Sequence, residues 1–201
     1  ALKVQGMTLD LSAPGALATV VAAFPAALTE LPQLRIVTKD GAPILSKEVY
    51  VEETYVLTHR AAAVPEVALN VEVGAWGKTT WGQPKNPYKL QFSNDAGYAK
   101  ITDVLGMKKQ RNWALLADYF DRSLLRNKLA LSLGSSSVFA DGLKWTPSGQ
   151  HVEVWLNNDY VGVYLLTEDI RIDPARLNLK KMSTDPGAND INGGYIVEVD
   201  S

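Results

Sequence analysis

The sequence predicts an α+β fold in which an antiparallel sheet is combined with one long helix. Val49–Thr58 and Val67–Val73 alternate apolar and polar residues, as half-buried strands do. Farther along the chain, leucines recur at helical spacing between Asn112 and Leu133. The 201 residues are 46% hydrophobic and 21% charged, which is ordinary for a folded protein and argues against disorder.

Two further segments complete the first part of the predicted sheet. Leu34–Thr38 is a short β-branched run, and the Asp-Gly pair that follows it is a turn signal. Pro87–Phe92 has the pattern of another strand. We expect loops at Ala61–Pro65 and Gly74–Pro84, between these strands.

The helix is predicted within Asn112–Leu133. Asp121 can cap its N-terminus with a side-chain oxygen, and Gly134 can end it. After the helix, Val152–Leu156 and Tyr160–Thr167 are predicted to form a hairpin around the polar tripeptide at 157–159. Because Tyr160–Thr167 is apolar on both faces, we expect that strand to be covered on both sides.

The end of the chain is predicted to be a strand, Gly194–Asp200. A strand in mid-sheet is an unusual place for a domain to stop, so we expect the chain to be a fragment. At the other end, Ala13–Ala27 is Ala-rich, but it contains two prolines and lacks a basic leading region. A short helix or packed leader suits it better than a signal peptide does.

Composition excludes several kinds of function. With 20 basic and 22 acidic residues, the net charge is −2, which gives no reason to expect nucleic acid as a partner. The chain has no cysteine and two histidines, so disulfides, thiolate metal sites and multi-histidine sites are not expected. No apolar stretch is long enough for a transmembrane helix. His59 and His151 are interpreted as surface or packing residues.

The first candidate site is the loop from Gly74 to Lys85, which contains glycines, hydroxyl side chains and two lysines. Such a loop can present backbone N–H groups and a cation to phosphate, and Lys85 or Lys89 follows it closely. The alternative is a hairpin loop whose tryptophans pack on the sheet, with lysines that are solvated. Spacing alone favours that alternative.

The second candidate is a set of carboxylates at Glu168, Asp169, Glu198 and Asp200. Glu198 and Asp200 are two residues apart and therefore share one face of a strand. Paired carboxylates can bind a divalent metal or share a proton, although they can equally face water. A third group, formed by Asp121, Arg126 and Asn127, is explained by helix capping, and a phosphate or substrate role is the minor alternative.

Taken together, several segments resemble the spore-coat protein H (CotH) kinase family, which has an atypical protein-kinase-like fold. The resemblance runs from about Leu34 to Asp200 in the family's order, and several motifs in order are more specific than one alone. The matching stretches are Trp81-Gly82-Gln83-Pro84-Lys85-Asn86-Pro87-Tyr88-Lys89, Asn112-Trp113-Ala114-Leu115-Leu116-Ala117, Asp121-Arg122-Ser123-Leu124-Leu125-Arg126-Asn127, Val152-Glu153-Val154-Trp155-Leu156-Asn157, Tyr160-Val161-Gly162-Val163-Tyr164-Leu165-Leu166-Thr167-Glu168 and Gly193-Gly194-Tyr195-Ile196-Val197-Glu198-Val199-Asp200.

The resemblance implies a secreted or cell-surface kinase that transfers phosphate from ATP to Ser or Thr of a surface or coat protein. It implies Mg²⁺ or Mn²⁺ as the metal. It also implies an N-terminal leader over residues 1–33, an N-lobe-like sheet and helix over 34–168, and the start of an incomplete C-terminal lobe over 169–201.

The resemblance also implies roles for single residues. Gly77, Lys78 and Thr79 would belong to the loop that covers the phosphates, and Lys85 would contact phosphate, with Lys89 as a substitute. Val161–Glu168 would enter the nucleotide hinge. Asp200 would be a catalytic or metal-binding carboxylate, with Glu198 as a second metal ligand.

Two departures from the family pattern favour an alternative, a non-catalytic binding or structural module on the same fold. The family loop usually reads Arg-Gly-Arg-Gly-Asn-Ser-Thr-Trp, whereas residues 74–81 read Gly-Ala-Trp-Gly-Lys-Thr-Thr-Trp. Both arginines are therefore absent, and Lys78 restores one charge without the bidentate fork of arginine. Ser132 stands where relatives often have an acid, which removes a potential partner for a lysine.

Overall fold

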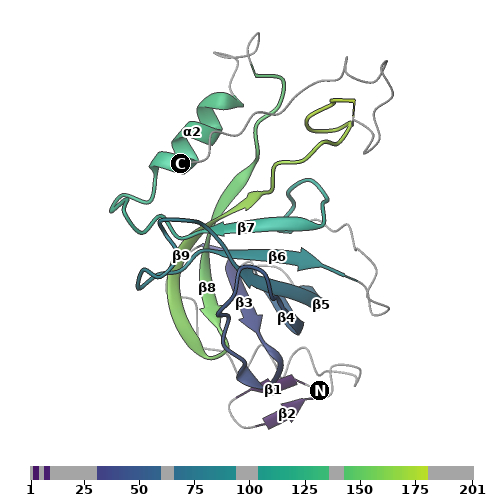
Figure 1. Ribbon diagram of the computed structural model, residues 1–201, viewed down its shortest axis with the longest axis vertical. Helices are drawn as coiled ribbons and strands as arrows, with labels where there is room; N and C mark the ends of the chain where they lie inside the picture. The colour runs from purple at the N-terminus through teal and green to yellow at the C-terminus, as the bar shows by residue number, and fades with distance from the viewer. Residues whose placement is uncertain are drawn as a thin grey trace.

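The computed structural model describes residues 2–4, 7–9, 31–59, 66–93, 104–135 and 143–180. Within them the chain is mostly sheet with one α-helix (Figure 1). A two-stranded antiparallel sheet is formed by β1 and β2. The other strands form a closed barrel in the order β3-β4-β5-β6-β7-β9-β8. The bounds are β1 Leu2–Val4, β2 Met7–Leu9, β3 Gln33–Val37, η1 Lys39–Gly41, β4 Val51–His59, β5 Glu66–Ala75, β6 Tyr88–Phe92, β7 Asn112–Leu116, α2 Arg126–Gly134, β8 Gly149–Leu156 and β9 Asp159–Glu168.

Most of the predicted strands are confirmed, and they pair antiparallel with their neighbours in the chain. The predicted hairpin is also confirmed, because β8 and β9 are joined by a turn in which Asn157 has φ 56°. Tyr164, Leu165 and Leu166 are all buried, so β9 is covered on both faces as its sequence predicts. The expectation of a purely antiparallel sheet is wrong, since β3 pairs parallel with β8 and thereby closes the barrel.

The predicted long helix is wrong in its first half. Asn112–Leu116 forms β7 between β6 and β9 instead. Trp113 and Leu115 alternate with outward-facing neighbours and are fully buried in the core. The core-facing side chains therefore recur every second residue, which is the repeat of a strand and not of a helix. The backbone then turns at Asp118 and Leu124, which have φ of 48° and 58° and cannot continue a helix.

The helix itself, α2, covers only Arg126–Gly134. The predicted capping role of Asp121 is confirmed in part: the N-cap position is Leu125, which makes no side-chain cap bond, but Asp121 still accepts a helix N–H from upstream. Its Oδ2 accepts the Arg126 backbone N–H at 2.9 Å, and its Oδ1 accepts the Ser123 N–H at 3.1 Å. The first of these bonds satisfies one of the donors that a helix N-terminus leaves unpaired, and the second lies in the turn before the helix. Figure 1 shows α2 beyond one end of the barrel, where it contacts the start of β8.

Three expectations from the sequence are not decided by this architecture. The Ala-rich segment at 13–27, the loop at 61–65 and the final strand at 194–200 lie outside the described residues. The division of the chain at residues 33 and 168 also stays a prediction. Among the described residues, no helix is long and apolar enough to cross a membrane.

Truncation of the barrel core tests this arrangement. Leu115 is fully buried in β7, so we expect Leu115→Ala to lower the free energy of unfolding by about 2–5 kcal/mol. Leu129→Ala is the matched control, because Leu129 on α2 is 58% exposed and its truncation should change stability by about 0.5 kcal/mol or less. Urea denaturation of both variants measures the difference. Equal destabilisation by the two changes would contradict the strand assignment of β7.

Candidate functional site

The outer face of the barrel at β5, β6, β7 and β9 carries the candidate site. Because side chains alternate along each strand, residues paired across strands share a face. One such row runs through Gly74, Lys89, Ala114 and Thr167, which are register partners in succession. The neighbouring row contains Leu116 and Leu165, and it reaches the loop after β5 through Pro87 and Trp76. These two rows form the wall of the barrel that faces α2.

A cavity of about 590 Å³ lies between this wall and α2. Its lining is mostly apolar, with the ends of β7 and β9 on one side and the helix on the other. The small side chain of Ala114, itself buried, leaves room at its floor. The lining residues are Trp76, Ala114, Leu116, Asn127, Ala130, Leu131, Pro147, Thr167, Glu168, Asp169 and Ile170.

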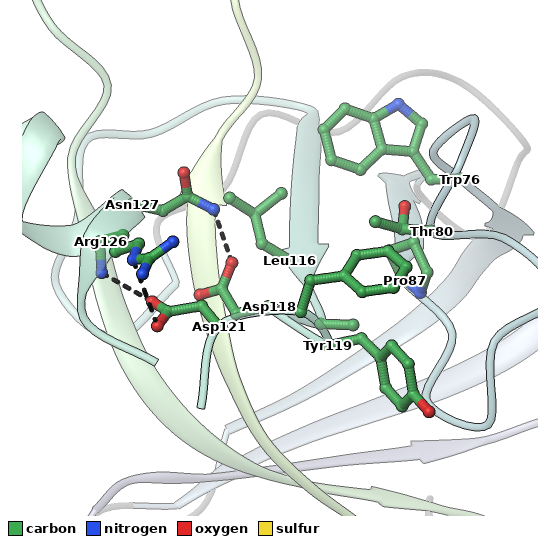
Figure 2. Close-up of a pocket in the computed structure, with 11 residues that line it drawn as sticks. Trp76, Thr80, Pro87, Leu116, Asp118, Tyr119, Asp121, Arg126 and Asn127 are labelled. Carbon is green, nitrogen blue, oxygen red and sulfur yellow. Dashed lines mark hydrogen bonds and ion pairs between the residues drawn. The ribbon is translucent and has the colours of Figure 1, made fainter. Parts of the chain in front are cut away.

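A second cavity, of about 280 Å³, adjoins the first and shares Trp76, Leu116 and Asn127 with it. Figure 2 shows its polar side, where the Asn127 amide points toward Asp118 and where Arg126 lies beside Asp121. The opposite side is formed by the loop after β5. The lining residues are Trp76, Thr80, Pro87, Leu116, Ala117, Asp118, Tyr119, Phe120, Asp121, Arg126 and Asn127.

The loop between β5 and β6 turns sharply at Gly77, whose φ is 83°. A Cβ there would lie 2.3 Å from Thr80 Oγ1, so the tight turn requires glycine. Lys78 and Thr79 are exposed at the tip of the turn, and Thr80 is the hydroxyl residue that lines the smaller cavity. The predicted phosphate-covering loop therefore borders the cavities. Its Trp76 side chain lines both of them, and its Thr80 side chain lines the smaller one.

Lys85 is held inside the protein by backbone oxygens. Its ammonium donates hydrogen bonds to the carbonyls of Ala117, at 2.6 Å, and Val163. The same group lies over the Tyr164 ring, 4.5 Å from the centroid. Burial lowers the pKa of Lys85, and the nearby Asp118 carboxylate partly opposes that shift. In this arrangement Lys85 fixes the backbone just before Asp118 and lines neither cavity.

Lys89 and Glu168 are also engaged by partners. Lys89 Nζ lies 3.0 Å from Asp169 Oδ2 at the rim of the larger cavity. The buried Glu168 carboxylate accepts Arg176 Nη2 at 2.7 Å and Nε at 2.9 Å, and its other oxygen accepts the Ser148 hydroxyl at 2.6 Å. Arg176 Nη2 also donates to the carbonyls of residues 108 and 109. Together these bonds fix the segment that leaves β9 along the cavity.

Asp118 was missed at the sequence level. Its left-handed backbone follows β7 directly, and Asn127 Nδ2 donates to its Oδ1 at 2.5 Å. Its Oδ2 is buried and has no hydrogen-bond partner among the described residues. Burial therefore raises the pKa of Asp118, whereas the Arg126 N–H and the Ser123 donors lower the pKa of Asp121. Nothing in the sequence pattern distinguishes Asp118 from an ordinary loop carboxylate.

The predicted metal ligands Glu198 and Asp200 lie outside the described residues. Within the part that the structure describes, no cluster of three or more His, Cys, Asp or Glu residues could hold a metal ion. Of the predicted site residues, Glu168 lines the larger cavity and Lys89 reaches its rim through Asp169. Gly77, Lys78, Thr79 and Lys85 line neither cavity, although Gly77 shapes the loop that brings Trp76 and Thr80 there. Their predicted roles toward a nucleotide stay predictions.

Comparison with known families decides the relationship that the motifs indicate. The family model described as "CotH kinase protein" matches residues 74–200. The chain belongs to the CotH kinase protein family. The matched region begins at the end of β5 and includes both cavities, Lys85, Glu168 and the predicted carboxylates Glu198 and Asp200. No curated protein matches the chain.

The buried ion pair gives a stability prediction for this CotH-family chain. Arg176→Met leaves the Glu168 carboxylate buried without its cation, so we expect the free energy of unfolding to fall by about 3–5 kcal/mol. The double variant Glu168→Gln/Arg176→Met should recover part of that loss, because no uncompensated charge remains. Chemical denaturation measures both. A double variant that is less stable than the single one would contradict this explanation.

The opposite pKa shifts of Asp118 and Asp121 give a pH prediction. The folded chain holds the Asp118 proton to higher pH than the unfolded chain does, so ionisation of Asp118 costs stability at neutral pH. We therefore expect Asp118→Asn to melt at a higher temperature than the parent at pH 7, with the difference vanishing below about pH 4. Asp121→Asn is the control with the opposite sign. Its lowered pKa stabilises the parent at neutral pH, and that advantage is lost as the pH falls through the folded pKa.

Thermal melts from pH 3 to pH 8 measure both differences. A lower melting temperature for Asp118→Asn at pH 7 would show that the Asp118 carboxylate is stabilised by its surroundings. That result would contradict the burial argument.

Proposed function

We propose that the chain is an atypical, kinase-like phosphotransferase. It binds ATP with Mg²⁺ or Mn²⁺ between α2 and the barrel wall and transfers the terminal phosphate to Ser or Thr of a protein. The observation that carries the proposal is that a mostly apolar cavity and a smaller cavity with a larger polar share, including two carboxylates, meet at Trp76, Leu116 and Asn127. Such a pair of cavities suits a ligand with a flat apolar base at one end and a charged tail at the other. Membership of the CotH kinase protein family supports the same chemistry.

The larger cavity is the base end. Its volume of about 590 Å³ lies within the range of cofactor sites, and its walls are formed mainly by Trp76, Ala114, Leu131 and Ile170. The segment that follows Glu168 lines this cavity. The nucleotide hinge that the family resemblance implies at the end of β9 would therefore lie beside the base. The bonds from Arg176 and Lys89 hold this segment in place, so the base would meet a preformed surface.

The smaller cavity is the phosphate end. Its two carboxylates, Asp118 and Asp121, outnumber its one cationic side chain, Arg126, which is 84% exposed. A bare triphosphate would be repelled by this arrangement, so a divalent cation must accompany it. The buried, unpartnered Oδ2 of Asp118 is an oxygen of the type that Mg²⁺ prefers, and it fits a role in holding the ion. Glu198 and Asp200 are proposed as the remaining carboxylates.

When bound, the metal would neutralise charge on the transferring phosphoryl group. The substrate hydroxyl oxygen would attack the γ-phosphorus while the bond to the β–γ bridging oxygen breaks, and ADP would leave. The proposed role of Asp200 is to accept the hydroxyl proton. The residues of the described site bind and orient, since phosphoryl transfer needs mostly positioning and charge neutralisation. We further propose that the protein is secreted or displayed at the cell surface and acts on a surface or coat protein.

A second candidate function is a non-catalytic binding or structural module on the same fold. The observation that favours it is the engagement of Lys85 by two carbonyl oxygens, away from both cavities. The residues at 74 and 76, where the family usually has arginines, are glycine and tryptophan. Such a module could bind a nucleotide or another aromatic ligand without transferring phosphate.

Binding is tested by thermal melting with millimolar ATP, with and without Mg²⁺. At ATP about a hundredfold above its dissociation constant, we expect the melting temperature to rise by roughly 5 °C or more with Mg²⁺ present, and by much less without it. Ala114→Leu places bulk in the base cavity and should abolish the rise. Circular dichroism of that variant verifies that it is folded. No rise for the parent chain would contradict the proposal.

Transfer is tested separately with γ-labelled ATP, Mn²⁺ or Mg²⁺ and a Ser/Thr-rich protein acceptor. The parent chain should label the acceptor and Asp200→Asn should not. Nucleotide binding without transfer by the parent would favour the non-catalytic module. Equal transfer by both proteins would remove Asp200 from the chemistry.

A further inference from the structure

We infer that Trp76 is the specificity-determining residue of the site, and that its indole stacks on the purine ring. The ligand is thereby recognised through its base rather than through its phosphates. This inference rests on the proposed function and goes beyond it, because it assigns the affinity to one aromatic side chain. It predicts that nucleosides and nucleoside monophosphates bind nearly as well as the triphosphate.

The backbone holds Trp76 rigidly at the mouth of both cavities. Its N–H donates to the Pro87 carbonyl at 3.1 Å, which extends the pairing of β5 and β6 by one residue. The chain then reverses at Gly77, where a Cβ would also meet Pro87 Cγ at 3.0 Å. Trp76 is thus the last residue fixed by the sheet, and the position of its side chain is set by a rigid element.

The indole lies where the two cavities meet. Trp76 is half-buried and lines both of them. Figure 2 shows the ring directed toward the side of the cavity on which Leu116 and Asn127 lie. Among the described residues that line the larger cavity, Trp76 is the one aromatic side chain. A nucleobase can use such a flat aromatic surface, since base–aromatic stacking contributes on the scale of other specific contacts.

The cationic side chains around the site are directed to protein oxygens. Lys85 donates to the two carbonyls behind the wall. Lys89 pairs with Asp169, and Arg126 lies 3.7 Å from Asp121 with most of its side chain in solvent. Solvated or internally paired cations add little to phosphate affinity. The base contact is therefore left as the main source of binding free energy.

The experiment titrates the protein with MgATP, MgAMP, adenosine and magnesium tripolyphosphate. It follows tryptophan emission and measures affinity by calorimetry. We expect the first three ligands to quench emission and to bind within about tenfold of one another, and tripolyphosphate to displace none of them. Trp76→Leu keeps apolar bulk but loses the aromatic face, so it should weaken MgATP binding on the order of tenfold or more. Trp76→Phe should keep most of the affinity and lose the quench.

Trp81→Phe is the matched control, because Trp81 belongs to the same loop but packs partly against the barrel core. It should keep both the affinity and the quench, and Trp76→Phe should melt like the parent. Parent-like binding by Trp76→Leu, a quench that persists in Trp76→Phe, or displacement of adenosine by tripolyphosphate would each overturn the inference and leave the proposed function standing. Failure of the parent chain to bind any of the nucleotides would overturn the proposed function as well.

Discussion

The register across β5, β6, β7 and β9 is the constraint on which the site depends. Because the barrel is closed, one face of these strands must fill its core, and every other residue is directed to the outer face. Trp113 and Leu115 are buried in the core, so Ala114 and Leu116 are left to face α2. A shift of one residue in any strand would exchange the two sets. The outer wall of the cavity is therefore as tightly specified as the core, although it is not itself part of the core.

Charged side chains at the rim of this wall bind other parts of the protein and thereby stabilise the fold. The Glu168–Arg176 pair connects the end of β9 to the segment before β7. Lys89 forms an ion pair with Asp169, the residue after Glu168. Lys85 connects the backbones of β9 and the residue after β7. A buried charge that lost its partner would be costly, so these cations are not readily released to a ligand. This use of lysine and arginine leaves the cavity with an excess of carboxylates and a neutral, aromatic entrance.

The sequence predicted the strands well, because alternation is a local signal that burial on one face enforces. It failed at Asn112–Leu116, where five residues are too few to separate a strand from a helix and the leucines at 124–133 lie close by. The parallel closure of β3 on β8 joins segments more than a hundred residues apart, and no local pattern encodes it. The family motifs pointed to the loop, which borders the cavities through Trp76 and Thr80, and to Lys85, whose role toward phosphate stays a prediction. They did not identify Asp118, whose buried oxygen arises from a left-handed turn and from the packing of Asn127.

The catalytic and the non-catalytic proposals use the same base cavity and differ only in how phosphate charge is neutralised. Without the loop arginines, and with Lys85 directed to carbonyls, the described residues supply little positive charge of their own. In the catalytic proposal, transfer would depend on divalent metal held by carboxylates, and Asp118 is the described carboxylate of the smaller cavity with an unpartnered buried oxygen. Base binding without metal would be compatible with either proposal, whereas phosphate transfer requires the ion. Metal-dependent phosphate transfer, rather than nucleotide binding, is therefore the property on which the choice between the two functions rests.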